Sequence, residues 1–284
     1  MTNLDKFYTK PNIAEQCYNF LKQFYPNIEN ETFLEPSAGS GNFLIYLKNY
    51  EAYDIAPEGE NIIKADFLSL ELNRNDYVTI GNPPFGKRSK LAIEFFNHAA
   101  KFSKIIAFIV PVSFMKWGVH KELDPKFKLQ AYMYIPKNSF TDKGKDFSVR
   151  CVFQIWTQEN ISDNLRILKA PPIKHEDFNI WQYNATPEAM KYIDENWKYA
   201  IYRQGYKDYH HLFTKAEYDI VKEQMERNIQ FFFIEPLCER AESFVHKADF
   251  EELAERNTST PGFGKADFVS YYLQWIKTLI IDNK

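Results

Sequence analysis

Cysteine is scarce in this chain of 284 residues and is not arranged for cross-linking. Cys17, Cys151 and Cys238 are scattered and show no C-x-x-C spacing, which argues against a disulfide framework and against a zinc site. The six histidines show no metal-ligand spacing either, so we expect no metal cofactor. Cysteine usage of this kind is typical of a reducing compartment.

Long apolar runs are also missing. Residues 1–17 lack the apolar core of a signal peptide. The longest apolar run, 105–110, is followed by Pro111 and is far too short to span a bilayer. Together with the cysteine usage, these features predict a soluble intracellular protein, cytoplasmic if the source is prokaryotic, with no membrane partner.

A strong charge of either sign is absent, because the net charge is −3 at pH 7. Bulk composition therefore demands no polyanionic partner, although binding depends on local charge. Residues 116–150 carry eight Lys or Arg against four Asp or Glu, a local excess of positive charge. Residues 199–211 interleave tyrosines with Arg, Lys and His, which suits either a nucleic-acid surface or a tyrosine-rich packing face.

Strand-like and helix-like patterns alternate over the first 160 residues. Strand patterns occur at 32–35, 53–55, 62–63, 77–80, 104–110, 129–135 and 149–157. Helical spacing occurs at 11–24, 42–50 and 91–102. This alternation predicts an α/β fold with a mostly parallel sheet covered by helices on both faces.

The pattern changes near residue 160. Beyond it we expect helices at 187–197, 214–231, 248–255 and 266–281. The chain is therefore predicted to consist of one domain at 1–160 and a small, mainly helical region at 161–284.

Candidate functional residues follow the predicted strands, where parallel sheets carry their functional loops. The loop EPSAGSG at 35–41 has the small residues that let a ligand approach the backbone. It lacks the spacing of a phosphate-binding loop, and Glu35 suits a cationic ligand group instead. Asp54 could accept hydrogen bonds from ribose hydroxyls, and Asp66 with Phe67 could hold an adenine ring.

Four segments in this order, FLEPSAGSGNFL, YDIAP, ADFL and GNPPFG, resemble the class I S-adenosylmethionine-dependent methyltransferases. More narrowly, they are similar to the adenine-N6 DNA methyltransferases with an Asn-Pro-Pro-Phe/Tyr loop, a cofactor motif placed first and a C-terminal target-recognition region. The resemblance covers about residues 5–157 and implies a Rossmann-like seven-stranded sheet, with 1–160 as the catalytic domain and 161–284 as a target-recognition or accessory region.

The resemblance also implies a cofactor, S-adenosylmethionine, with S-adenosylhomocysteine as the product. In it Glu35 faces the methionine amino group, Asp54 the ribose, and Asp66 and Phe67 the adenine. The implied cofactor-binding residues are Phe7, Tyr8, Thr9, Pro11, Glu35, Pro36, Ala38, Gly39, Gly41, Asp54, Ile55, Asp66, Phe67 and Asn82.

The loop GNPPFG has a chemical reason for its residues. The exocyclic amine of adenine is a poor nucleophile because its lone pair is delocalised into the ring. Two acceptors, the side-chain oxygen of Asn82 and the main-chain carbonyl of Pro83, would localise that lone pair and stabilise the developing positive charge. Pro84 restricts the conformation of Pro83, and Phe85 would stack on a flipped base. We therefore predict Asn82, Pro83, Pro84 and Phe85 as catalytic residues that need neither a general base nor a metal.

On the substrate side we expect a second stacking ring from Phe140, or failing that from Phe147. Lys87 and Arg88, directly after the catalytic loop, could meet phosphates, although a solvated helix start would look the same. The expected partner is nucleic acid, with DNA as the leading candidate, and a partner subunit or a homodimer stays open.

Three alternatives remain at this stage. The catalytic loop cannot separate DNA from RNA as the methylated nucleic acid. Methyltransferases of protein glutamine side chains also carry an Asn-Pro-Pro loop, usually followed by Tyr. The fold could also serve a non-catalytic nucleic-acid-binding subunit, although such subunits tend to lose one or both of the two central motifs.

Overall fold

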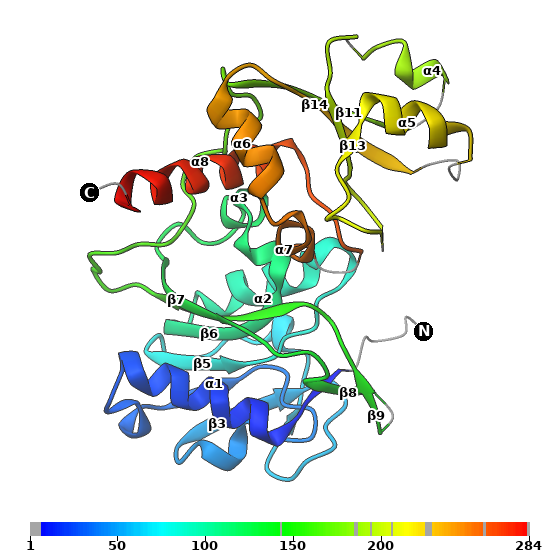
Figure 1. The fold of residues 1–284 in the computed structure, drawn as a ribbon. Helices are drawn as coiled ribbons and strands as arrows, with labels where there is room; N and C mark the ends of the chain where they lie inside the picture. The colour runs from blue at the N-terminus through cyan, green and yellow to red at the C-terminus, as the bar shows by residue number, and fades with distance from the viewer. Residues whose placement is uncertain are drawn as a thin grey trace. The chain divides into compact units, whose positions relative to one another are not determined.

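The computed structural model describes residues 7–142, 144–184, 187–193, 195–205, 207–224, 229–257 and 260–282. The chain divides into two compact units, Met1–Lys169 and Ala170–Lys284 (Figure 1). None of the described helices combines the length and the apolar character that crossing a membrane requires.

The first unit is built on a seven-stranded sheet. Its strands are β2 (Phe33–Glu35), β3 (Tyr50–Asp54), β4 (Ile63–Lys64), β5 (Tyr77–Gly81), β6 (Ser103–Pro111), β7 (Lys128–Tyr134) and β10 (Cys151–Thr157). The spatial order is β4-β3-β2-β5-β6-β10-β7. The pairs from β4 through β6 are parallel, and β10 runs antiparallel to both of its neighbours. The predicted Rossmann-like, mostly parallel seven-stranded sheet is therefore confirmed, and all seven predicted strands are present.

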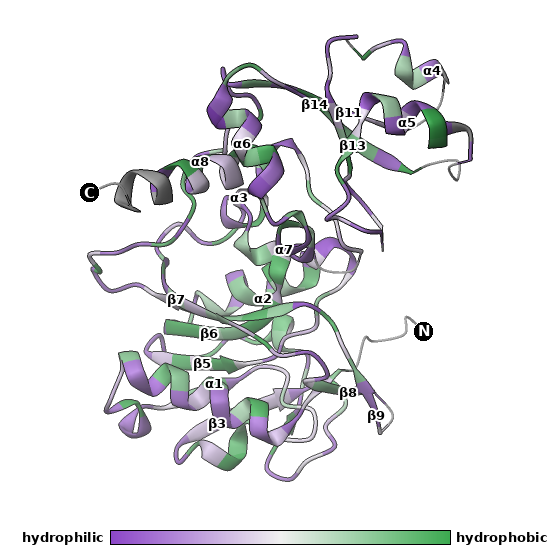
Figure 2. Ribbon diagram, in the orientation of Figure 1, coloured by the Kyte–Doolittle hydropathy of each residue, from purple (hydrophilic) through white to green (hydrophobic). Residues whose placement is uncertain are grey.

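Helices cover both faces of this sheet. They are α1 (Pro11–Phe24), α2 (Lys90–Ala99) and α3 (Trp117–His120). Phe20 of α1 packs edge-on against Phe153, and Phe96 of α2 packs edge-on against Trp156. Phe153 and Trp156 lie three residues apart on β10, so their side chains point to opposite faces. The central strand β6 is apolar along most of its length, as Figure 2 shows, and is buried between these two layers.

The predicted helix at 42–50 is wrong. Only a single 3-10 turn, Leu44–Tyr46, forms there, and Tyr50 already belongs to β3. Tyr50 pairs with Phe33 at the start of two parallel strands. Turns occupy residues 36–43 of the connection between β2 and β3, so only residues 44–49 remain before β3 begins, which is too short for the predicted helix.

A second, three-stranded sheet was not predicted. It consists of β1 (Tyr8–Thr9), β8 (Phe140–Asp142) and β9 (Lys145–Phe147), in the order β1-β8-β9. All of its pairs are antiparallel. This sheet holds residues 8 and 9 beside a segment that follows about 130 residues later in the chain.

The second unit contains more strand than expected. A four-stranded antiparallel sheet joins β11 (Phe178–Asn184), β14 (Gln230–Pro236), β12 (Tyr199–Tyr202) and β13 (Phe213–Thr214), in that order. Its helices are α4 (Pro187–Met190), α5 (Lys215–Val221), α6 (Glu239–Lys247), α7 (Phe250–Glu255) and α8 (Lys265–Asp282). Helices make up more of the described part of this unit than strands do, as predicted, but the sheet that organises it was not predicted.

The run at 231–234 explains the error. Phe231 and Phe233 belong to one buried cluster, whereas Phe232 and Ile234 belong to another. A strand buried on both faces does not alternate apolar and polar residues. Its apolar run therefore looked like a continuation of the helical pattern that begins at 214, and the predicted helix was extended to 231.

The boundary between the units lies after Lys169, not after residue 160 as expected. Residues 161–169 belong to the first unit, and hydrogen bonds from the side chain of Arg166 bind them to it. Its guanidinium donates hydrogen bonds of 2.7 Å to four main-chain carbonyls, those of His120, Leu123, Asp124 and Phe127. The same group lies over the ring of Trp156.

Replacing Arg166 by alanine is expected to lower the free energy of unfolding by about 3–5 kcal/mol, because four partly buried carbonyls lose a charged donor. Urea unfolding followed by tryptophan fluorescence measures the change. Arg74→Ala is the matched control, since Arg74 pairs with Asp76 at the surface and should cost less than about 1 kcal/mol. Equal losses in the two variants would contradict the structural role of Arg166.

Candidate active site

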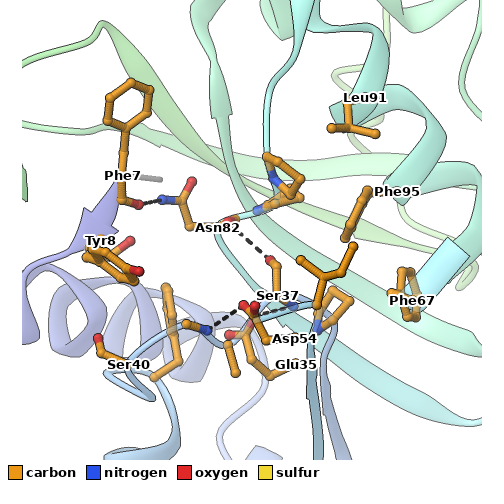
Figure 3. A pocket seen from close by; sticks show the side chains of 18 of the residues that line it. Phe7, Tyr8, Glu35, Ser37, Ser40, Asp54, Phe67, Asn82, Leu91 and Phe95 are labelled. Carbon is orange, nitrogen blue, oxygen red and sulfur yellow. Dashed lines mark hydrogen bonds between the residues drawn. The ribbon is translucent and has the colours of Figure 1, made fainter. Parts of the chain in front are cut away.

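The loops that follow β2, β3, β4 and β5 enclose a cavity of about 290 Å³ (Figure 3). It brings together most of the residues singled out in the sequence. Those lining it are Phe7, Tyr8, Thr9, Glu35, Pro36, Ala38, Gly39, Asp54, Ile55, Asp66, Phe67, Asn82, Pro83, Pro84 and Phe85.

Six of the singled-out residues do not line the cavity. Pro11 is the first residue of α1, and Gly41 occupies a turn with φ +84°. Lys87 and Arg88 are exposed in the turn that follows the catalytic loop. The prediction of Phe140 as a stacking ring is wrong, because it is 0% exposed, packs in the core and pairs with Thr9 of β1. Phe147, the second choice, stacks on Phe7 and does not line the cavity.

Other lining residues were missed in the sequence. They are Ser37, Ser40, Asn42, Phe43, Ala65, Leu68, Leu91 and Phe95. Ser37 and Ser40 lie inside the predicted loop at 35–41, so the loop itself was their signal. Leu91 and Phe95 share one face of α2, and helical spacing alone does not say which face meets the cavity and which the core.

Glu35 ends β2 and is buried, with 1% of its surface exposed. One carboxylate oxygen accepts a hydrogen bond from the main-chain N–H of Ser37 at 3.3 Å. Burial raises the pKa of the Glu35 carboxyl well above its usual range, and the nearby charge of Asp54 adds to the rise. A side chain at Gly81 would collide with this carboxylate, since an added Cβ would lie 2.1 Å from it. The buried acid is thus suited to a cationic ligand group.

Asp54 ends β3 and holds the glycine loop. One carboxylate oxygen accepts from the N–H of Gly39 at 2.8 Å, and the other from the N–H of Ala56 at 2.7 Å. Gly39 has φ +53°, and an added Cβ would lie 2.8 Å from the ring of Tyr8. The phenol of Tyr8 in turn donates to the carboxylate of Glu58. These contacts fix the backbone conformation of the glycine loop next to the ring of Tyr8.

Asp66 and Phe67 follow β4 at the apolar end of the cavity. The carboxylate of Asp66 accepts from the N–H of Leu68 at 3.1 Å, so it caps the 3-10 turn that follows. The ring of Phe67 is buried and packs against Phe95 and edge-on against His98. This end of the cavity suits a flat apolar group.

Asn82 follows β5, and its side-chain amide has a hydrogen-bond partner for its NH₂ group but none among the described residues for its oxygen. Its Nδ2 donates to the main-chain carbonyl of Phe7 at 3.1 Å, and its main-chain carbonyl accepts from the hydroxyl of Ser37 at 3.2 Å (Figure 3). Its Oδ1 is buried and has no partner among the described residues. Phe85, three residues on, is 9% exposed and also lines the cavity. The GNPPFG loop thus holds an acceptor without a partner among the described residues and an aromatic ring, both on residues that line the cavity.

The turn that follows is strained. Gly86, Arg88 and Ser89 all have positive φ, at +66°, +55° and +63°. The hydroxyl of Ser89 lies 2.7 Å from that of Ser113, which helps to hold a conformation that costs free energy for residues other than glycine. This turn leads into α2, which brings Leu91 and Phe95 to the cavity.

No protein-family model matches the sequence, and no curated protein matches it either. Among solved structures, a candidate RNA methyltransferase from Pyrococcus horikoshii is similar to 54% of this chain and 87% of its own, at 17% identity and a TM-score of 0.43. A candidate class I S-adenosylmethionine-dependent methyltransferase from Listeria monocytogenes matches 60% of this chain and 65% of its own, at 13% identity and a TM-score of 0.46.

The M protein of the type I restriction enzyme EcoKI matches 49% of this chain and 41% of its own, at 16% identity and a TM-score of 0.37. At these identities and TM-scores the similarities add nothing to the strand order, which defines the fold by itself. Within the part of the chain that the structure describes, no group of three or more His, Cys, Asp or Glu side chains could hold a metal ion.

Proposed function

We propose that this chain transfers a methyl group from S-adenosylmethionine to the exocyclic N6 amine of adenine in DNA. The observation that carries the proposal is Oδ1 of Asn82, a buried acceptor without a partner in the described part of the chain. A buried acceptor left in this state costs about 1–3 kcal/mol, which a ligand N–H would recover. It belongs to a cavity whose other residues suit the cofactor.

The cavity fits S-adenosylmethionine at three points. The buried Glu35 suits the ammonium of the methionine part, and its charge becomes favourable when a cation is beside it. Asp54 lies where ribose hydroxyls could share its carboxylate, whose oxygens each keep a further acceptor position. Phe67 and Phe95 form an apolar end for the adenine ring. When bound, this cofactor supplies an electrophilic methyl group on a sulfonium centre.

The catalytic loop would act on the target amine through two acceptors. Oδ1 of Asn82 and the main-chain carbonyl of Pro83 accept the two N–H groups of the amine, localise its lone pair and stabilise the positive charge that develops. Pro84 restricts Pro83, and the ring of Phe85 stacks on the base. No residue has to remove a proton before transfer.

The choice of a nucleic-acid base rests on the expected target side, and the choice of DNA over RNA rests on the resemblance of GNPPFG to the adenine-N6 DNA methyltransferases. A base must leave the stack to reach a loop of this kind, and an aromatic wall offsets part of the lost stacking. Lys87 and Arg88 are exposed directly after the loop and suit phosphate contacts. Residues 170–284 serve in this proposal as a target-recognition or accessory region, with or without a partner subunit.

The test uses purified protein with radiolabelled S-adenosylmethionine. Duplex DNA, single-stranded DNA, RNA and a protein extract are offered in parallel, and the labelled product is digested and identified. N6-Methyladenine from DNA supports the proposal. The same product from RNA alone, label on protein glutamine, or cofactor binding without any transfer would each replace it by one of the alternatives.

Asp54→Ala is expected to weaken S-adenosylhomocysteine binding by about tenfold or more, since a charged hydrogen-bond acceptor is lost. Calorimetry with S-adenosylhomocysteine and its 2′-deoxy analogue separates two causes. If Asp54 holds the ribose, wild type prefers the hydroxylated ligand and Asp54→Ala loses that preference. A preference that survives the substitution would limit Asp54 to shaping the glycine loop.

A further inference from the structure

The main-chain carbonyl of Phe7 determines which way the amide of Asn82 faces. A carbonyl oxygen only accepts hydrogen bonds, so it selects the NH₂ side of the amide, at 3.1 Å. Turning the amide over would bring two oxygens together at that distance. The contact therefore directs Oδ1 away from Phe7, to the buried position where it has no partner among the described residues (Figure 3).

The carbonyl of Phe7 is itself held by a distant part of the chain. Its ring stacks on Phe147 of β9, with centroids 4.1 Å apart and planes 6° from parallel. The next residues form β1, which pairs with β8. The N–H of Lys10 donates to the carbonyl of Ser139 at 3.0 Å, and its ammonium lies 2.7 Å from the carboxylate of Asp146. Contacts from residues 139–141 and 146–147 thus hold residues 7–10 in place.

A third contact ties the same segment to the glycine loop side of the cavity. Nδ2 of Asn42 donates to the carbonyl of Thr9 at 2.7 Å. The amides of Asn42 and Asn82 therefore bind the carbonyls of Thr9 and Phe7. Of these two amides, the one whose oxygen is recorded as buried without a partner among the described residues is that of Asn82. The segment at 7–10 holds Asn82 in a defined orientation.

We propose that Phe7 and Phe147 are positioning residues for the methyl-transfer step: the stacked rings hold the Phe7 carbonyl, which keeps Oδ1 of Asn82 available to the target amine. This inference rests on the proposed function. It assigns Phe147 a role different from the expected stacking on the target base. The reversed amide would present its own N–H groups to the N–H groups of the amine, and the acceptor would be lost.

The first test measures single-turnover methylation of adenine at saturating cofactor and DNA. Phe147→Ala is expected to lower the rate about 3- to 10-fold, the size of one neutral hydrogen bond. Phe147→Tyr keeps the ring and should restore the rate. Phe24→Ala is the matched control, because it removes an exposed ring on α1 that does not line the cavity, and should leave the rate unchanged.

The decisive comparison is made in an Asn82→Asp background. A carboxylate has two equivalent oxygens, so it accepts in either orientation and has no NH₂ for Phe7 to select. Adding Phe147→Ala to Asn82→Asp should then leave the remaining rate unchanged. A further loss of the same factor as in wild type would overturn the inference, because Phe147 would then act on something other than the amide.

A measurement without turnover keeps the inference independent of the proposed function. The side-chain NH₂ resonances of Asn82, assigned by their loss in Asn82→Asp, are compared in ¹⁵N spectra of the full chain. Phe147→Ala should shift them and speed their exchange with solvent, whereas Phe24→Ala should not. Unchanged resonances would overturn the inference. Changed resonances in a protein that methylates no nucleic acid would retain the positioning contact and reject the proposed function alone.

Discussion

Replacing Asn82 by alanine is expected to lower the methylation rate at saturating substrates by about 100- to 1,000-fold. The substitution removes one of two acceptors aimed at charge that develops only in the transition state, and such groups have effects of this size. Cofactor affinity should change much less, because the lost oxygen faces the target amine. Single-turnover kinetics and calorimetry with S-adenosylhomocysteine measure the two effects separately.

Asn97→Ala is the matched control for this substitution. Asn97 lies on α2, donates to the carbonyl of Glu122 at 2.9 Å and does not line the cavity. It should reproduce the loss of an asparagine hydrogen bond to the main chain without a loss of rate. A rate for Asn82→Ala within about threefold of wild type would remove Asn82 from the catalytic assignment.

Replacing Glu35 by glutamine is expected to weaken cofactor binding by about 10- to 100-fold and, without cofactor, to stabilise the protein near neutral pH. The first effect follows from the loss of a buried negative charge opposite the cofactor's ammonium. The second has the opposite sign because the charge is buried without a cation. Burial raises the pKa of Glu35 well above its ordinary value of 4.5.

The sign of the pH dependence follows from that shift. An acid whose pKa is raised in the folded state contributes stability while it is protonated, and this contribution is lost as the pH rises from about 4.5 through the raised folded value. Wild type should therefore lose stability over this interval relative to Glu35→Gln. Ligand binding should follow the reverse trend, since wild-type affinity for S-adenosylhomocysteine rises as Glu35 ionises.

Thermal unfolding between pH 4 and pH 8, with and without S-adenosylhomocysteine, measures both trends. Glu94→Gln, at an exposed glutamate on α2, is the control and should follow wild type. If Glu35→Gln binds the cofactor as tightly as wild type, the ammonium is held elsewhere. If the two unfolding curves stay parallel over this pH range, Glu35 is not the group whose charge is penalised.

Much of the first unit was predictable because its signals are local. A strand buried on both faces reads as an apolar run, and β6 is such a run from residue 105 to 110. Glu35, Asp54 and Asn82 each follow a strand directly, and the carboxyl ends of parallel strands meet at one edge of the sheet. Spacing along the chain was therefore enough to place them in one cavity.

Errors arose where the outcome depends on contacts between distant residues. Phe140 and Phe147 are equally aromatic in the sequence, yet one pairs into the core opposite Thr9 and the other stacks on Phe7. In the sequence, the apolar run at 231–234 resembles the end of a helix. In the structure, its alternate residues belong to two different buried clusters. Local propensity does not contain that information.

The sequence by itself determined the order of the strands along the chain, the identity of the acids and the amide at their ends, and the chemistry open to an Asn-Pro-Pro-Phe loop. Only the tertiary structure decided how those groups are held: Glu35 is buried against Gly81, Asp54 accepts from the glycine loop, and the amide of Asn82 is oriented by Phe7. The physical reason is that burial and hydrogen-bond direction depend on neighbours 15 to 75 residues away in the chain. A residue's type sets what it can accept or donate, and its neighbours in space set which of those bonds remain for a ligand.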